Sequence, residues 1–172
     1  MAVFVALLRA VNVGGTGKLP MADLVKLCEK AGLQSPKTYI QSGNVVFGTK
    51  GTEAKVKATL EKALTEKLGK PAGVLVRTGP ELRKVLADNP FKEAAPNRVL
   101  VMFLDTAPPK DSLEGVATPA GERLALGARE IYIHYPEGQG TSKLKVPFSK
   151  EGTARNLNTI AKLAEMAEAH AG

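Results

Sequence analysis

Residues 38–47, "TYIQSGNVVF", read as two short strands joined by a Ser-Gly turn. β-Branched and aromatic residues flank a glycine on both sides, a pattern that predicts an antiparallel hairpin. Three polar side chains, Gln41, Ser42 and Asn44, crowd around Gly43, which is more than a turn requires. This corner therefore either contacts the polar edge of a ligand or braces neighbouring segments of the chain.

The segments around the hairpin predict an alternation of strands and helices. Residues 3–9 form a short apolar run before a glycine-rich loop, which is typical of a buried strand. Residues 19–33 and 52–68 carry apolar side chains at helical spacing and end at glycines. Residues 73–77, "GVLVR", give a further strand. The order strand, helix, strand, strand, helix, strand is that of a ferredoxin-like split βαβ unit.

The second half predicts a similar order of elements. Thr78 and Glu81 form a capping box for a short helix. Residues 98–104 are apolar almost throughout, which favours the middle of a sheet. We expect a brief helix between prolines within 106–119, and a last helix from about 153 to 169.

Two more strands, 122–127 and 129–135, are expected to pair across Gly127. The sequence thus predicts an α+β fold of two tandem ferredoxin-like (α/β-plait) subdomains, with mainly antiparallel sheets and helices packed on one face. The N-terminal ferredoxin-like subdomain would span residues 1–78. The C-terminal subdomain, with the terminal helix, would span residues 79–172.

Composition and charge limit the location and the partners. The 172 residues include 24 Lys and Arg against 17 Asp and Glu, a net charge of +7 that favours anionic partners. Alternating Lys and Glu along 53–67 indicate a solvated, ion-paired helix face. The single cysteine, Cys28, lies in a helical pattern and is expected to be a buried structural thiol. No apolar run predicts a membrane span or a signal peptide, so we expect a cytoplasmic protein and no membrane partner.

The loop 9–18, "RAVNVGGTGK", has the layout of a phosphate-binding loop. The Walker pattern fails because Asn12 replaces its first glycine and Leu19 replaces its Ser or Thr. The dinucleotide-binding pattern fails because Pro20 stands at its third glycine. Several backbone donors beside Arg9 and Asn12 remain, and the alternative is a flexible connection that needs glycine for its backbone angles.

A second polar patch is expected on the last helix. On a helical wheel Arg155, Thr159 and Lys162 form a stripe opposite the apolar face. The alternative is an ordinary amphipathic helix with a wetted polar side. His134 is expected to be structural or at the surface, and no spacing indicates a metal site or a catalytic triad.

The motifs "LLRAVNVGG…LPMADL", "TYIQSGNVVF", "VRT…NPF" and "TARNLNTIAKL" resemble those of the family catalogued as domain of unknown function 1697, small bacterial proteins. The resemblance covers essentially the whole chain and implies tandem ferredoxin-like halves. It brings no established activity, cofactor or catalytic residue. Ala10 stands where the commonest family form has glycine, and Leu157 stands where an aromatic residue is common.

We expect the polar motif positions to line one pocket for a small anionic ligand or a nucleotide. They are Arg9, Asn12, Gly14, Gly15, Gln41, Ser42, Gly43, Asn44, Arg155, Asn156, Thr159 and Lys162. One alternative is nucleic-acid binding, which fits the charge and the plait architecture. The other is a non-catalytic interaction module, whose polar motifs brace the fold. Whether the protein is an enzyme, and which cofactor or oligomeric state it has, stays open at this level.

Overall fold

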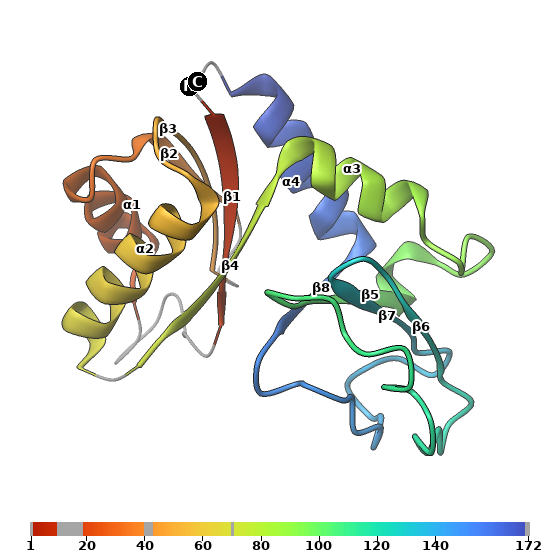
Figure 1. The fold of residues 1–172 in the computed structure, drawn as a ribbon. Coiled ribbons are helices and arrows are strands. Elements are labelled where there is room, and N and C mark those ends of the chain that lie inside the picture. The colour runs from red at the N-terminus through yellow and green to blue at the C-terminus, as the bar shows by residue number, and fades with distance from the viewer. Residues whose placement is uncertain (1, 10–18, 40–42, 70, 171–172) are drawn as a thin grey trace. The chain divides into compact units, whose positions relative to one another are not determined.

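The computed structural model describes residues 2–9, 19–39, 43–69 and 71–170, which form two compact units (Figure 1). Unit 1 comprises residues 1–82 and 163–172, and unit 2 comprises residues 83–162. Each unit contains one four-stranded sheet in which all neighbouring strands are antiparallel. The predicted α+β class is confirmed.

The sheet of unit 1 has the strand order β2-β3-β1-β4. The predicted hairpin at 38–47 is confirmed, because β2 and β3 pair antiparallel on either side of it. In chain order the elements are β1 (Ala2–Arg9), α1 (Met21–Lys30), β2 (Gln34–Tyr39), β3 (Asn44–Thr49), α2 (Glu53–Leu68) and β4 (Gly73–Thr78).

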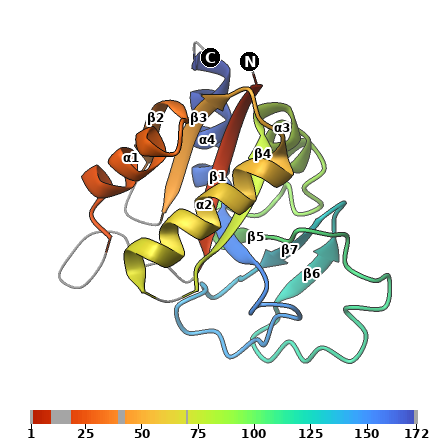
Figure 2. The ribbon, with the colours of Figure 1, turned by 60° about the vertical axis from the view of Figure 1, so that its left-hand side comes forward.

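Strand β1 lies in the interior of this sheet and is buried on both faces. Phe4, Ala6 and Leu8 pack into the core formed with α1 and α2. Val5 and Leu7 point to the other face and are also buried. On that side lie residues 163–169 at the end of α4 (Leu157–Ala169), opposite α1 and α2 (Figure 2). A strand with two buried faces explains the unbroken apolar run in the sequence.

The ends of α2 are fixed by the residues that the sequence indicated. Thr52 is its N-cap, and the Thr52 hydroxyl accepts a hydrogen bond from the Lys55 backbone N–H at 3.2 Å. Gly69 ends the helix with a φ of +71°, a conformation that favours glycine.

In α1, Cys28 is fully buried, and burial raises the pKa of its thiol to about 12. The prediction of a buried structural thiol is confirmed.

Strand β4 is an edge strand whose outward backbone groups are bound by α2. The Val74 N–H donates to the Glu61 carboxylate at 3.0 Å, and Lys57 Nζ donates to the Val74 carbonyl at 2.6 Å. Lys57 and Glu61 also pair with each other at 2.9 Å. Two side chains thus bind the groups that a further strand would bind, which protects this edge against pairing with another chain.

The sheet of unit 2 has the order β6-β7-β5-β8, with β5 inside it as predicted. Residues from β5 and β7 form one core face, against which the non-helical segments 104–122 and 135–152 pack through Leu113, Leu144 and Val146. The elements are α3 (Gly79–Ala87), the short η1 (Pro96–Arg98), β5 (Val99–Phe103), β6 (Arg123–Leu126), β7 (Glu130–His134), β8 (Thr153–Asn156) and α4. Helices α3 and α4 each begin in one unit and end in the other.

Two predicted elements of this half are wrong. Residues 106–119 form turns instead of a brief helix, because Gly115, only six residues after Pro109, adopts a φ of +74°, which is outside the helical region. Residues 153–156 form β8 instead of the first turn of the last helix, because they pair with β5. Tertiary pairing overrides the weak local preference of a four-residue polar segment.

Among the described residues, no helix is long and apolar enough to cross a membrane.

We expect Glu61→Ala to lower the free energy of unfolding by about 1–2 kcal/mol, because the buried Val74 N–H loses its acceptor. Chemical denaturation of the full chain measures this change. Glu66→Ala is the matched control, since Glu66 lies on the same helix and forms no hydrogen bond or ion pair with the described residues. Equal stability of the two variants would show that the contact to β4 contributes nothing.

Candidate functional site

Two of the predicted site residues lie at one end of the unit 1 sheet, on one face. Leu7 of β1 is paired with Asn44 of β3, and Arg9 is paired with Gly73 of β4. Paired residues point to the same face, and so do residues two apart along a strand. Arg9 and Asn44 therefore share the face opposite α1 and α2.

Gly43 is required by the backbone of the hairpin corner. Its φ is +79°, and a Cβ at this position would lie 3.0 Å from the Leu8 Cβ. The Gly43 carbonyl accepts a hydrogen bond from the Leu8 N–H at 2.9 Å. The corner is thus fastened directly to β1.

Asn44 has a bracing role in the same corner. Its side chain is fully buried, and Nδ2 donates to the Tyr39 carbonyl across the turn at 3.0 Å. A buried amide must be hydrogen-bonded, and this bond closes the end of the hairpin. The side chain that the sequence offered as a ligand contact therefore holds the two strand ends together.

Arg9 lies across the first residue of β4. A Cβ on Gly73 would come within 2.6 Å of both Nε and Nη2 of Arg9, so the guanidinium occupies the space that glycine leaves open. Arg9 is half-buried, at the last position of β1. Glycine at 73 thus lets a cationic side chain lie flat along the sheet.

Five predicted site residues, Asn12, Gly14, Gly15, Gln41 and Ser42, lie outside the described residues. The described residues next to them do converge. Arg9 precedes the segment 10–18, and Gly43 follows the segment 40–42. Both are attached to the same end of the sheet through the pairing of β1 with β3.

The other predicted site residues belong to unit 2, and the predicted helical stripe is wrong. Arg155 lies on β8, not on the helix, and only 7% of it is exposed. Its Nη1 donates to the Thr153 hydroxyl at 2.7 Å and to the Ala154 carbonyl at 2.9 Å. Burial lowers the Arg155 pKa to about 10. Thr159 is buried as well, and Lys162 is exposed.

Asn156 is the N-cap of α4. Its Oδ1 accepts a hydrogen bond from the Thr159 backbone N–H at 2.9 Å, three residues into the helix. The side-chain oxygen thus satisfies a helix donor that would otherwise have no partner. The structure assigns Asn156 a capping role.

Sequence reasoning missed a second arginine that occupies the position equivalent to Arg155. Arg77 lies on β4, the edge strand of unit 1 that corresponds to β8 in the sheet order of unit 2. It is 1% exposed, and its Nη1 donates to the carbonyl of the preceding residue at 2.9 Å, as that of Arg155 does. Each arginine is paired with a valine of the neighbouring central strand.

The residue that follows each arginine caps the next helix. After Arg77, the Thr78 hydroxyl accepts from the Glu81 N–H at 3.2 Å, and the Glu81 carboxylate accepts from the Thr78 N–H at 2.8 Å. This confirms the predicted capping box. In both units, therefore, the last strand in the chain carries a buried arginine, which is followed by a capping residue and then by a helix. The signal in the sequence was an arginine directly before a capping residue, in "VRT" and in "TARN".

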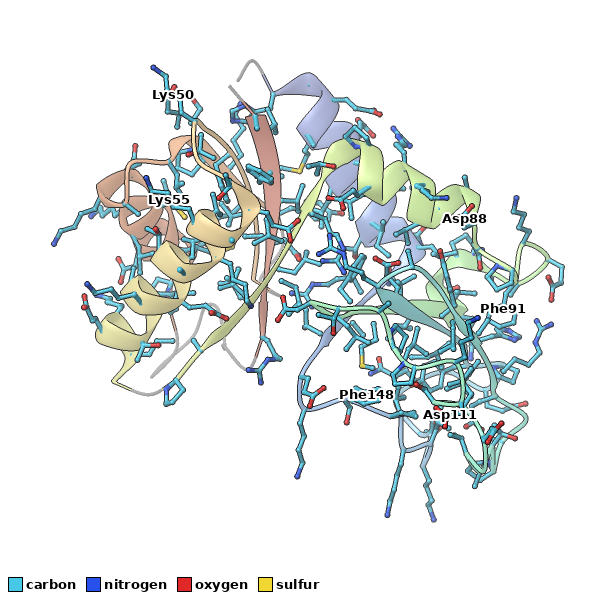
Figure 3. The ribbon with its side chains drawn as sticks, in the orientation of Figure 1. Lys50, Lys55, Asp88, Phe91, Asp111 and Phe148 are labelled. Carbon is cyan, nitrogen blue, oxygen red and sulfur yellow. The ribbon has the colours of Figure 1, made fainter. Side chains whose placement is uncertain are left out.

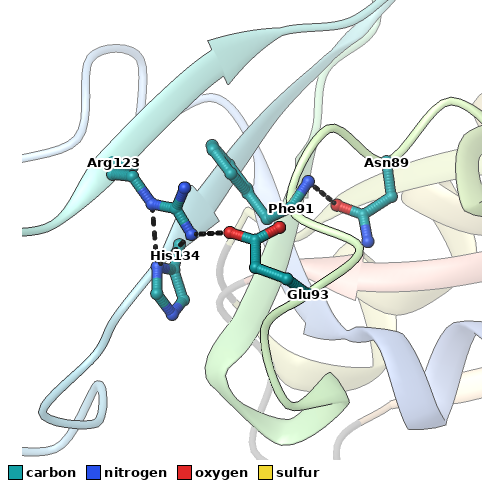
Figure 4. Close-up of polar contacts among 5 residues, drawn as sticks. All are labelled: Asn89, Phe91, Glu93, Arg123 and His134. Carbon is teal, nitrogen blue, oxygen red and sulfur yellow. Dashed lines mark hydrogen bonds and ion pairs between the residues drawn. The ribbon is translucent and has the colours of Figure 1, made fainter.

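A polar cluster on the surface of unit 2 was not predicted. Arg123 and His134 are paired across β6 and β7, and Arg123 forms an ion pair with Glu93 (Figure 4). The guanidinium carbon lies 4.7 Å from the ring centre of Phe91, a cation–π distance. The backbone N–H of Phe91 donates to Asn89 at 3.0 Å, which fixes the loop that carries Phe91 and Glu93.

The contacts within this cluster affect the tautomer and the protonation of the His134 imidazole. Nδ1 of His134 accepts a hydrogen bond from Arg123 Nε at 3.1 Å, which assigns the proton of the neutral ring to Nε2. Burial and then the charge of Arg123 lower the His134 pKa. His134 is therefore neutral at pH 7, and Arg123 occupies the nitrogen that could act as a base. Among the described residues, no group of three or more His, Cys, Asp or Glu could hold a metal ion.

A family model described as "Protein of unknown function (DUF1697)" matches residues 1–132. The chain belongs to this family. This DUF1697 protein also shares its fold with a conserved bacterial protein from Streptococcus pneumoniae, at a TM-score of 0.80 and 23% sequence identity. The two superpose over 98% of this chain and 99% of the other. No curated protein matches the chain.

The resemblance to the DUF1697 family that the motifs predicted is thus confirmed, and the structural match supports the α+β fold over the whole chain. Neither comparison names an activity, so the role of the site has to be argued from its residues.

We expect Asn156→Ala to lower the stability of this DUF1697 protein by about 1 kcal/mol, because α4 loses its N-cap. Asn158→Ala is the matched control, since Asn158 lies two residues further on and is exposed. Thermal unfolding of both variants beside the unaltered chain measures the difference. Equal midpoints for all three would contradict the capping role.

We expect an NMR titration of the imidazole to place the His134 pKa below 6.5, and Arg123→Ala to raise it. The folded chain then binds this proton more weakly than the unfolded chain does. The contribution to stability is therefore complete above pH 6.5 and is lost as the pH falls through the folded pKa. An unchanged His134 pKa in the variant would show that the Arg123 charge does not act on the ring.

Proposed function

We propose that this protein binds a small anionic or nucleotide-like ligand at the end of the unit 1 sheet. The observation that carries the proposal is the position of Arg9, a half-buried cation that lies over Gly73 on the face shared with Asn44. In the chain, Arg9 directly precedes the segment with Asn12, Gly14 and Gly15, and Gly43 directly follows the segment with Gln41 and Ser42.

The chemistry of this set suits an anion. A guanidinium offers paired donors to a carboxylate or a phosphate. Glycine-rich segments let backbone N–H groups approach a phosphate closely. Amide and hydroxyl side chains can form hydrogen bonds with the polar groups of a ligand, and their protonation state does not change with pH in the physiological range. The set includes no acid–base pair, so we propose binding and orientation of the ligand, not hydrolysis through a triad.

Four described residues of the predicted site form hydrogen bonds that hold the fold of their own unit. Gly43, Asn44, Arg155 and Asn156 bind backbone groups of their own unit. We assign these to positioning. We assign contact with the ligand to Arg9, because its positively charged guanidinium is half-buried and lies over Gly73 at the end of the sheet.

The same bracing contacts favour a second candidate, a non-catalytic interaction module. In that case the polar motifs serve the fold alone. The two candidates differ in one respect that can be measured, because only the first requires Arg9 to act on a ligand.

We also propose that both units share the strand order of a ferredoxin-like fold, that unit 1 alone carries its two helices among the described residues, and that the protein is cytoplasmic. The strand order β2-β3-β1-β4, with a helix after β1 and another after β3, supports the first point for unit 1. The buried, protonated thiol of Cys28 agrees with a reducing compartment.

We expect one or more anions from a panel of inorganic phosphate, pyrophosphate and nucleotides to raise the melting temperature of the full chain. A ligand at 1,000 times its dissociation constant stabilises by about 4 kcal/mol. Arg9→Met should remove the ligand-induced shift, measured against the variant's own ligand-free melting temperature.

Gly73→Ala provides a sharper version of the same experiment. The new methyl group displaces the guanidinium of Arg9, which is the end of a flexible side chain, without removing any charge. We expect it to weaken binding as Arg9→Met does. The proposal would be contradicted if no anion of the panel raised the melting temperature, or if the rise persisted in both Arg9→Met and Gly73→Ala. The interaction module would then remain as the candidate function.

A further inference from the structure

Helices α1 and α2 leave an open groove between them on the outside of unit 1. Its volume is about 680 Å³. Leu27 of α1, Ala31 directly after α1, and Ala63 of α2 line it and are only partly buried. The groove therefore presents apolar surface that the fold itself does not cover.

Lysines dominate the polar residues of this groove. Lys26 and Lys30 of α1 and Lys62 of α2 line it and are exposed. None of the three forms a hydrogen bond or an ion pair with any residue that the structure describes. A fourth, Lys67, lies 3.9 Å from Asp23, an exposed and therefore weak pair.

A second hollow of about 320 Å³ continues the groove toward the start of α2. It shares Ala31 and Thr59 with the first. Lys50 and Lys55 line it, and Figure 3 labels both near the start of α2. Among the described residues that line the two hollows, six lysines stand against two acidic residues, Asp23 and Glu66.

The sequence predicted an ion-paired face for α2. In the structure, some lysines of that face are paired and others are not paired with any described residue. Lys57 is bound by Glu61 and by the edge of β4. Lys62, on the groove side, forms no such pair with a described residue. The uncompensated positive charge is thus concentrated on the side of the helix where the apolar surface is exposed.

We propose that this groove, which we call the basic groove, binds an acidic amphipathic helix of a protein partner. A groove between two neighbouring helices, with apolar side chains along its floor, can accept a third helix whose apolar face covers Leu27, Ala31 and Ala63. Acidic side chains on the flanks of that helix pair with the lysines of the rim. Charge complementarity and exposed apolar area then act together, as they do at specific interfaces.

The composition of the basic groove disfavours nucleic acid as its occupant. Nucleic-acid sites use arginine and aromatic side chains, on which bases stack. The residues of the two hollows include neither. A phosphate backbone would also leave the apolar floor uncovered. The site is separate from Arg9 and its neighbours, so the proposal does not depend on the ligand proposed there.

The test is fluorescence anisotropy of the full chain with labelled model helices of 12, 16 and 20 residues. Each probe carries Leu and Ala on one face and Glu on the flanks. We expect at least one probe to bind, and the combined change Lys26→Glu, Lys30→Glu and Lys62→Glu to weaken it at least tenfold. The matched control is Lys110→Glu, Lys143→Glu and Lys145→Glu, with equal charge change on exposed lysines of unit 2, and should stay within twofold.

Two further probes distinguish an acidic amphipathic helix from other anionic partners of the basic groove. A helix with Gln in place of its Leu residues should bind at least fivefold more weakly, because it cannot cover the apolar floor. Equal binding of that helix would overturn the proposal, since it would show attraction to any polyanion. A single-stranded oligonucleotide that binds more tightly than every helix, and is released by the groove variant, would overturn it in favour of nucleic acid. Failure of all three helices to bind, or equal loss in groove and control variants, would also overturn it.

Discussion

Burial of the central strand on both faces is the constraint on which unit 1 depends. Strand β1 packs against α1 and α2 on one side and points Val5 and Leu7 to the other, and both sides are buried. Its register with β3 and β4 is therefore fixed, because a slip by one residue would exchange the two faces. That register determines where Arg9 lies and which residue it meets. The candidate site is thus a consequence of how the core strand is paired.

The parts of the fold that local chemistry controls were predictable from the sequence. The hairpin at 38–47, the capping box at Thr78 and the stop at Gly69 each depend on residues a few positions apart. Strand β8 was not predictable in the same way, because "TARN" becomes a strand only by pairing with β5. The helix expected within 106–119 was wrong because Gly115 adopts a backbone conformation that ends a helix, and the short helical pattern before it was too weak to show this.

The candidate site shows the same division. Sequence reasoning found Arg155 and Asn156 but gave them the wrong surroundings, because a helical wheel cannot show that a residue lies on a strand. Sequence reasoning did not single out Arg77, because its equivalence to Arg155 is visible only when the two sheets are compared strand by strand. Repetition of the arginine and the capping residue in both units argues that they serve the junction between sheet and helix. Arg9 has no counterpart in that repeat, which is why it carries the functional proposal.

The make-up of unit 1 has a consequence for synthesis on the ribosome. Its sheet is complete after residue 78, yet residues 163–169, on the face opposite α1 and α2, follow about 80 positions later. At about 5–20 residues per second, several seconds separate these two events. During that interval the face of the nascent sheet opposite α1 and α2 lacks these residues of unit 1, so the first half of the chain is the part that a chaperone would have to shield.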